Sequence, residues 1–77
     1  MEIEIISFGQ LAEFIANQRM DIGDIRDSDG LKKHLEASFP MLAESKYKLA
    51  LNKIVVNENL QINNNDTLAI MPPFSGG

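Results

Sequence analysis

The residues best suited to chemistry lie at the carboxyl end of this 77-residue chain, which closes with Pro72, Pro73, Phe74, Ser75, Gly76 and Gly77. Gly76 and Gly77 lack a Cβ atom, so a Gly-Gly end can enter a narrow channel and bring a bare carboxylate to a reaction centre. The two prolines restrict φ and favour an extended segment of the polyproline type. The sequence therefore predicts a body formed by residues 1–71 and a stiff arm, residues 72–77, with a flexible, reactive tip.

The remaining residues give little support to catalysis by the chain itself. It contains no cysteine, which excludes thiolate metal sites and cysteine nucleophiles. His34 is the one histidine and has no partner nucleophile or metal ligand nearby in the sequence, so we expect a surface or partly packed helix residue. Asp24, Asp27 and Asp29 fit helix capping better than a metal loop. We expect no metal and no cofactor bound to this chain.

Composition limits the partners. The net charge of −4 disfavours nucleic acid, whose binding depends on phosphate neutralisation by Lys and Arg, and is compatible with a basic protein partner. No apolar run reaches the ~20 residues that cross a bilayer, and the start of the chain lacks a signal-peptide pattern. We therefore expect a cytoplasmic protein that binds neither nucleic acid nor membranes.

Hydrophobic spacing predicts strands at residues 1–8 and 67–71, whose apolar residues alternate, and one main helix between them. The helix begins at Asp27 or Ser28, which are good N-cap residues, and it ends before Pro40. The stripe that this helix would bury contains Leu31, Leu35, Ser38 and Phe39.

Shorter elements fill the remaining sequence. We expect a short helix at 10–18, a strand at 20–25 antiparallel to the first strand, β-rich runs at 47–51 and 53–56, and a turn at 63–66. This order indicates an α+β fold in which a mixed sheet packs on one main helix, with the first and last strands as parallel central neighbours. It is the order of the β-grasp, or ubiquitin-like, fold.

Alternation divides the apolar side chains of the first and last strands between the two faces of the sheet. The set expected to face the helix is Ile3, Ile5, Leu68 and Ile70. The set expected to face away is Ile6, Phe8, Ala69 and Met71, and Val55 is expected to join it. One helix cannot cover both faces, so the second set predicts an apolar protein-binding surface beside the arm. The alternative is that residues 10–18 or a loop fold over it.

Several segments together resemble the MoaD-type sulfur carriers, the small subunits of molybdopterin synthase. The resemblance spans nearly the whole chain and is most specific in the final Pro-Pro-Phe-Ser-Gly-Gly. It departs at Asn65-Asp66, where an Asp-Gly turn is usual, and at Ala12, where Arg is frequent. The segments that carry it are Ser7–Leu11, the helix with Leu31, His34 and Leu35, Leu49–Val56 with Asn52, and Asn65–Gly77.

The resemblance implies a role for each part of the arm. An ATP-dependent activating enzyme would adenylate Gly77, and a sulfur donor would convert the adenylate into a thiocarboxylate. The arm, turning at Gly76, would then enter the large synthase subunit, within a heterotetramer, and deliver sulfur to cyclic pyranopterin monophosphate. ATP would be used by the activating enzyme and not bound by this chain. The residues expected to bind the partners are Phe8, Val55, Met71, Pro72, Pro73, Phe74 and Ser75.

Other functions remain open from the sequence. A sulfur carrier of another pathway, such as the thiamine type, and a ubiquitin-like protein modifier also end in Gly-Gly. A non-covalent β-grasp interaction module, in which the Gly-Gly end has no role, is an alternative of a different class.

Overall fold

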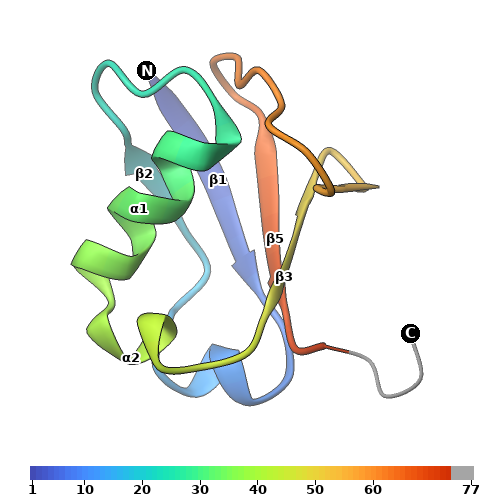
Figure 1. The fold of residues 1–77 in the computed structure, drawn as a ribbon. Coiled ribbons are helices and arrows are strands. Elements are labelled where there is room, and N and C mark those ends of the chain that lie inside the picture. Colours follow the sequence, from blue (N-terminus) through green and yellow to red (C-terminus); the bar gives the residue numbers. More distant parts are fainter. Residues whose placement is uncertain (74–77) are drawn as a thin grey trace.

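The computed structural model describes residues 1–73, in which a five-stranded mixed sheet packs against one main helix (Figure 1). The strand order is β2-β1-β5-β3-β4. The first and last strands are parallel neighbours at the centre, and the other strand pairs are antiparallel. This arrangement confirms the predicted β-grasp architecture. No helix in residues 1–73 is long and apolar enough to cross a membrane.

The bounds of the elements follow the predicted order. They are β1 (Glu2–Ser7), the 3-10 helix η1 (Gly9–Glu13), β2 (Gln18–Asp21), α1 (Ser28–Ser38), α2 (Pro40–Ala43), β3 (Lys48–Leu51), β4 (Ile54–Val55) and β5 (Thr67–Met71).

The hydrophobic core lies between α1 and one face of the sheet. The four strand residues predicted to face the helix are fully buried, and Leu31 and Leu35 of α1 are buried against them. Ser38, which we expected on the same stripe, is exposed, because α1 ends at this residue. Phe39 follows the helix and packs on the core as a partly buried residue. Pro40 ends α1 as predicted and also begins the short helix α2.

The start of α1 is fixed by side-chain hydrogen bonds. The carboxylate of Asp27, the N-cap residue, accepts a hydrogen bond from the Gly30 amide at 2.9 Å. That bond, followed by the Asn59 amide group, holds the pKa of the Asp27 carboxyl below its ordinary value. Ser28 is buried, and its hydroxyl oxygen accepts from the Leu60 amide at 2.8 Å. The helix start is thereby tied to the loop that precedes β5.

The predicted helix at residues 10–18 is wrong in type and length. The structure has a 3-10 helix over Gly9–Glu13, and the amides of Phe14 and Ile15 both donate to the carbonyl of Leu11. The helix-like apolar spacing arises because Leu11 and Ile15 are both buried in the core. The chain then returns to the sheet at Asn17, whose side chain accepts a hydrogen bond from the Ser7 amide at 2.8 Å.

The second strand is antiparallel to β1 as predicted, but it covers Gln18–Asp21 and not residues 20–25. The Asp21 carboxylate accepts a hydrogen bond from the Gly23 amide at 2.9 Å, and Gly23 has a φ of 59°. This turn ends the strand. Ile22 and Ile25, which we assigned to the strand, pack on the core from the loop that follows.

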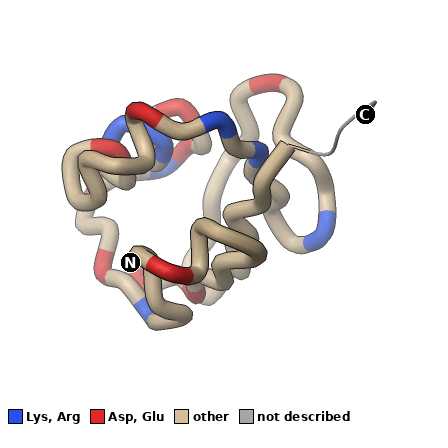
Figure 2. The backbone as a smooth tube through the Cα atoms, turned by 90° about the horizontal axis from the view of Figure 1, so that it is seen from below, with Lys and Arg blue, Asp and Glu red and all other residues tan. Residues whose placement is uncertain are grey.

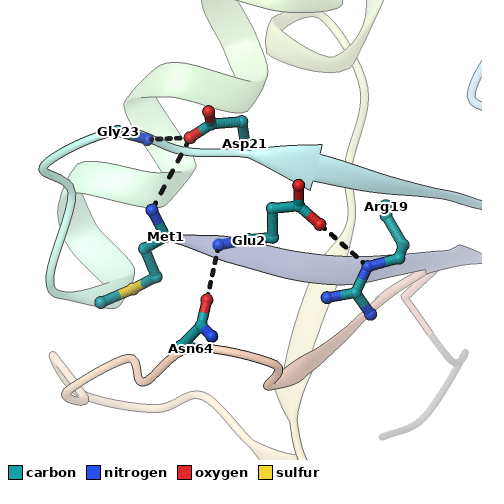
Figure 3. A network of polar contacts seen from close by, with 6 residues as sticks. All are labelled: Met1, Glu2, Arg19, Asp21, Gly23 and Asn64. Atoms are coloured by element: carbon teal, nitrogen blue, oxygen red, sulfur yellow. Dashed lines mark hydrogen bonds and ion pairs between the residues drawn. The ribbon is translucent and has the colours of Figure 1, made fainter.

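A polar network closes the end of the sheet farthest from the end of β5 (Figure 3). The amino terminus lies 3.8 Å from the Asp21 carboxylate, and the Arg19 guanidinium lies 3.1 Å from that of Glu2. The Glu2 amide donates to the Asn64 side chain at 2.8 Å. The face of the sheet away from α1 thus has a polar end at the start of β1, and its apolar residues lie toward the end of β5.

Asn52 joins the β3–β4 turn to the start of β5. The turn consists of Asn52 and Lys53, whose φ angles of 50° and 73° are both positive, as in a type I′ turn. The Asn52 carboxamide accepts from the Thr67 amide at 2.9 Å and donates to Asp66 at 3.0 Å, while its own amide donates to the Thr67 carbonyl at 2.8 Å. Both side-chain bonds depend on this residue, and asparagine tolerates the left-handed backbone conformation of the turn.

We predict that Asn52→Ala lowers the free energy of unfolding by about 1–2 kcal/mol, because it removes two hydrogen bonds and places alanine at a positive φ. Denaturant unfolding followed by circular dichroism measures the change. Asn57→Ala is the matched control, since the Asn57 side chain is exposed and makes no hydrogen bond within residues 1–73. Equal stability of the two variants would contradict the role given to Asn52.

Candidate functional site

The arm leaves the body directly at the end of β5, where Met71 is followed by Pro72 and Pro73 (Figure 1). Pro72 is half-buried, and it packs closely on Gly9 at the start of η1. A Cβ atom placed on Gly9 would lie 3.0 Å from Cγ of Pro72, closer than ordinary contact. Gly9 also has a φ of 62°, a conformation that favours glycine. The first residue of the arm is therefore held against a glycine that no other residue type replaces without strain.

A mainly apolar hollow of about 370 Å³ lies on the open face of the sheet. We call it the open-face hollow; its lining residues are Ile6, Phe8, Ala50, Asn52, Lys53, Thr67 and Ala69. The strand register explains its position, because Ile6 pairs with Ala69, which in turn pairs with Ala50. Ala69 and Ala50 have small side chains, which leave the space beside Ile6 that larger residues would fill.

The structure brings together the apolar residues predicted to face away from the helix. Ile6, Phe8 and Ala69 line the open-face hollow, and Phe8 is 49% exposed although it is a large aromatic residue. Met71 is half-buried on the same face, opposite Lys48 of β3. Neither η1 nor a loop of the described chain covers Phe8, so the partner surface predicted from alternation is free in residues 1–73.

Val55 lies elsewhere. It pairs with Ala50 in the register and is 45% exposed, but it lines a second hollow of about 250 Å³ at the edge of β3 and not the open-face hollow. The structure therefore does not bring Val55 together with Phe8, and a contact with the same partner stays a prediction. The described residues that line this second hollow are Ser28, Asp29, Lys32, Tyr47, Lys48, Leu49, Val55, Val56, Asn57 and Glu58.

One residue that lines the second hollow, Tyr47, has a structural role. The Tyr47 hydroxyl donates a hydrogen bond to the Glu36 carboxylate, and the Lys32 ammonium lies 5.6 Å from the centre of the Tyr47 ring. Burial, together with the bond to Glu36, raises the pKa of the Tyr47 hydroxyl. These contacts tie β3 to α1, so Tyr47 serves to dock the helix on the sheet.

Four residues of the site were not singled out from the sequence: Gly9, Ala50, Lys53 and Thr67. Ala50 and Thr67 could have been found by extending the alternation from Ala69 to the neighbouring positions, once the strand order was assumed. Lys53 could have been found from the two-residue turn between the β-rich runs. The contact of Gly9 with Pro72 has no sequence signal, because it depends on how a loop and the arm meet in space.

The described residues offer no other chemical centre. In residues 1–73, no group of three His, Asp or Glu side chains could hold a metal ion. His34 is half-buried on α1 and makes no hydrogen bond or ion pair to a described residue. The predicted reactive and partner-binding residues Phe74, Ser75, Gly76 and Gly77 lie outside the described residues.

The fold and the site define a β-grasp protein whose exposed apolar face adjoins a Pro-Pro arm. The model of the ThiS family matches residues 5–77, nearly the whole sequence. The chain therefore belongs to the ThiS family and is a sulfur carrier of the ThiS/MoaD type.

Two solved structures are similar to it over 100% of both chains. SAMP1 from Haloferax volcanii matches with a TM-score of 0.78 at 21% identity. The complex of subunits 1 and 2 of molybdopterin-converting factor from Helicobacter pylori 26695 contains a chain that matches with a TM-score of 0.72 at 22% identity. These likenesses show the β-grasp fold. No curated protein matches the sequence.

We predict that Gly9→Ala destabilises the protein more than Gly23→Ala does. Both glycines have a positive φ, 62° at Gly9 and 59° at Gly23, but a Cβ atom on Gly23 would meet nothing within 4 Å. The shared strain of about 1 kcal/mol or more should appear in both variants, and the clash with Pro72 only in Gly9→Ala. Denaturant unfolding measures both changes, and the Met71 methyl resonance reports movement at the base of the arm.

Equal destabilisation by the two substitutions, with an unmoved Met71 resonance in Gly9→Ala, would contradict the close contact between Gly9 and Pro72.

Proposed function

We propose that this chain is the sulfur-carrying small subunit of molybdopterin synthase. The observation that carries the proposal is the continuity of β5 with the sequence Pro72-Pro73-Phe74-Ser75-Gly76-Gly77, which starts beside the exposed Phe8 and the open-face hollow. A carrier needs both a chemically active end and a surface that lets different enzymes hold the body. The likeness to a chain from a molybdopterin-converting factor complex and the terminal motif support this choice within the family.

Loading begins at the carboxylate of Gly77. A carboxylate is a poor acceptor of sulfur, because its oxygen is a poor leaving group. An ATP-dependent activating enzyme forms the Gly77 acyl-adenylate and releases pyrophosphate. A sulfur donor then supplies sulfur at the oxidation level of sulfide, which forms the C–S bond as AMP leaves. The product is a thiocarboxylate, whose sulfur is nucleophilic near neutral pH.

Delivery takes place in the large subunit. The thiocarboxylate sulfur attacks a side-chain carbon of cyclic pyranopterin monophosphate that carries an oxygen substituent; the C–S bond forms as the C–O bond breaks and the oxygen leaves with its electron pair, which joins Gly77 to the substrate through sulfur. Water then cleaves the bond between the Gly77 carbonyl carbon and sulfur, which leaves sulfur on the pterin and restores the carboxylate. Because the dithiolene of molybdopterin contains two sulfur atoms, two loaded chains serve each product. A heterotetramer of two large and two small subunits fits this count.

The body positions the tip. Phe8 and Met71, together with Phe74, are the proposed apolar anchors on the large subunit and on the activating enzyme, with Val55 as a further contact at the sheet edge. Pro72, held by Gly9, and Pro73 pre-order the start of the arm, and this lowers the entropy lost on insertion. Ser75 and Gly76 complete the segment that enters the channel.

The family match favours a second candidate, a sulfur carrier of the thiamine type. Its loading chemistry is the same, and only the acceptor enzyme differs. Sulfur transfer from the loaded chain to a thiazole synthase, with none to a pterin synthase, would select this candidate. Isopeptide adducts between Gly77 and lysines of other proteins would instead indicate a ubiquitin-like modifier.

We predict that the intact mass of the chain rises by about 16 Da after incubation with ATP, a sulfur source and a molybdopterin-pathway activating enzyme, because sulfur replaces one oxygen at Gly77. Mass spectrometry measures the shift. The chain with Gly77 deleted is the control, and it should show none. Adding the large subunit and cyclic pyranopterin monophosphate should return the mass to its starting value as molybdopterin forms.

An unchanged mass, with the activating enzyme proven active on another carrier, would contradict the proposal and favour a non-covalent interaction module. A mass shift followed by no transfer to the pterin would place the carrier in a different pathway.

A further inference from the structure

Lys53 occupies a backbone position that suits glycine. It is the second residue of the two-residue β3–β4 turn, where its φ of 73° is unfavourable for residues with a Cβ atom. Asn52, the first residue of the turn, makes hydrogen bonds that anchor the start of β5. Lys53 makes no side-chain hydrogen bond or ion pair to the described residues. Nothing within residues 1–73 therefore compensates for lysine at this position.

The side chain of Lys53 has a definite place on the surface. Lys53 lines the open-face hollow together with Phe8, and both are exposed. Lys48 lies on the same face, opposite Met71 at the base of the arm. Lys53 thus lines the open-face hollow itself, while Lys48, which also lines the second hollow, lies at the other end of β3 beside Met71.

These lysines stand out against the charge of the protein. The chain has a net charge of −4, but residues 46–57 contain three lysines and no Asp or Glu. The ion pairs within residues 1–73 are Met1 with Asp21 and Arg19 with Glu2, and neither includes a lysine. In Figure 2 most acidic positions lie toward the side that carries the N-terminus, whereas basic positions occur on both sides. Along β3 and its turn the charge is therefore opposite in sign to the net charge, whereas the acidic neighbours of the hollow lie near the start of β5, where Glu4 is opposite Thr67 and Asp66 is hydrogen-bonded to Asn52.

We propose that Lys53 and Lys48 form a basic rim that recognises carboxylates on the protein partner that docks on the open-face hollow. The partner surface that fits presents an apolar side chain to the hollow and Asp or Glu residues on either side of it. The inference rests on the proposed function, because it concerns the enzymes that load and receive the arm. It replaces the expectation of a basic partner, which was drawn from net charge alone.

The proposed rim would orient the partner and raise the rate of association. Exposed charge pairs at the edge of an interface contribute little to affinity, but they steer encounter and disfavour wrong partners. The apolar hollow alone would accept many hydrophobic side chains. The lysines restrict docking to surfaces with complementary charge.

The test measures association of the full-length chain with its activating enzyme by stopped-flow or surface plasmon resonance at low and high salt. Lys53→Glu and Lys48→Glu should each slow association by roughly tenfold or more at low salt, with a smaller effect at high salt. Lys33→Glu is the matched control, because it makes the same charge change on an exposed position of α1, which covers the opposite face of the sheet. Its association rate should stay within about twofold of wild type.

Lys53→Gly separates binding from folding. It removes the charge and also relieves the positive φ, so the midpoint of thermal unfolding should rise while association slows. A lower midpoint would show that Lys53 supports the fold and would overturn the argument from its backbone conformation.

Two further outcomes are decisive. If Lys53→Glu and Lys33→Glu associate at the same rate while wild type acquires the thiocarboxylate mass, the basic rim is wrong and the proposed function stands. If wild type neither binds the activating enzyme nor gains mass, both the rim and the proposed function are contradicted.

Discussion

Parallel pairing of β1 with β5 at the centre of the sheet sets the positions of the other parts of this molecule. Ile5 lies opposite Leu68 and Ser7 opposite Ile70, so the two strands direct matching side chains to the same face. α1 buries that face and leaves the other face of the sheet uncovered (Figure 1). Because side chains alternate along a strand, the residues that build the core also require Ile6 and Ala69 to face away from it. The exposed apolar surface is thus a direct consequence of how the core is made.

The same strand connects this surface to the arm. β5 contributes Ala69 to the open-face hollow and two residues later ends at Met71, from which Pro72 continues against Gly9. A partner that holds the hollow therefore also fixes the origin of the arm. Pre-ordering of this kind reduces the conformational freedom lost on docking, which matters for a carrier that must bind and leave successive enzymes. The fold supplies position, and the proposed chemistry resides entirely in the terminal carboxyl group.

Much of this arrangement follows from the sequence, and the exceptions have physical reasons. The core residues of β1 and β5 were predictable because strand alternation is strict. A cap at Asp27 or Ser28 was predictable because short polar side chains fit the free amides of a helix start, and the structure uses Asp27. The helix expected at residues 10–18 failed, because Leu11 and Ile15 reach the core from a 3-10 turn that has the same apolar spacing. Val55 was expected to join the apolar residues that face away from the helix; it pairs with Ala50 but does not line the open-face hollow, because β4 has only two residues and lies at the sheet edge. The contact between Gly9 and Pro72 joins distant parts of the chain, so local patterns carry no sign of it.

The central claim is that the open face of the sheet, and not exposed apolar surface in general, is the docking surface that accompanies the arm. The most direct measurement compares, by calorimetry, the affinities of Phe8→Arg and Met41→Arg for the proposed partner, the large subunit of molybdopterin synthase. Both residues are exposed and apolar, at 49% and 60%, but Met41 lies on α2, away from the open face. We predict a loss of about tenfold or more for Phe8→Arg, since a charge would then face an apolar contact, with wild-type affinity for Met41→Arg. Equal affinities, with both variants folded, would contradict the claim.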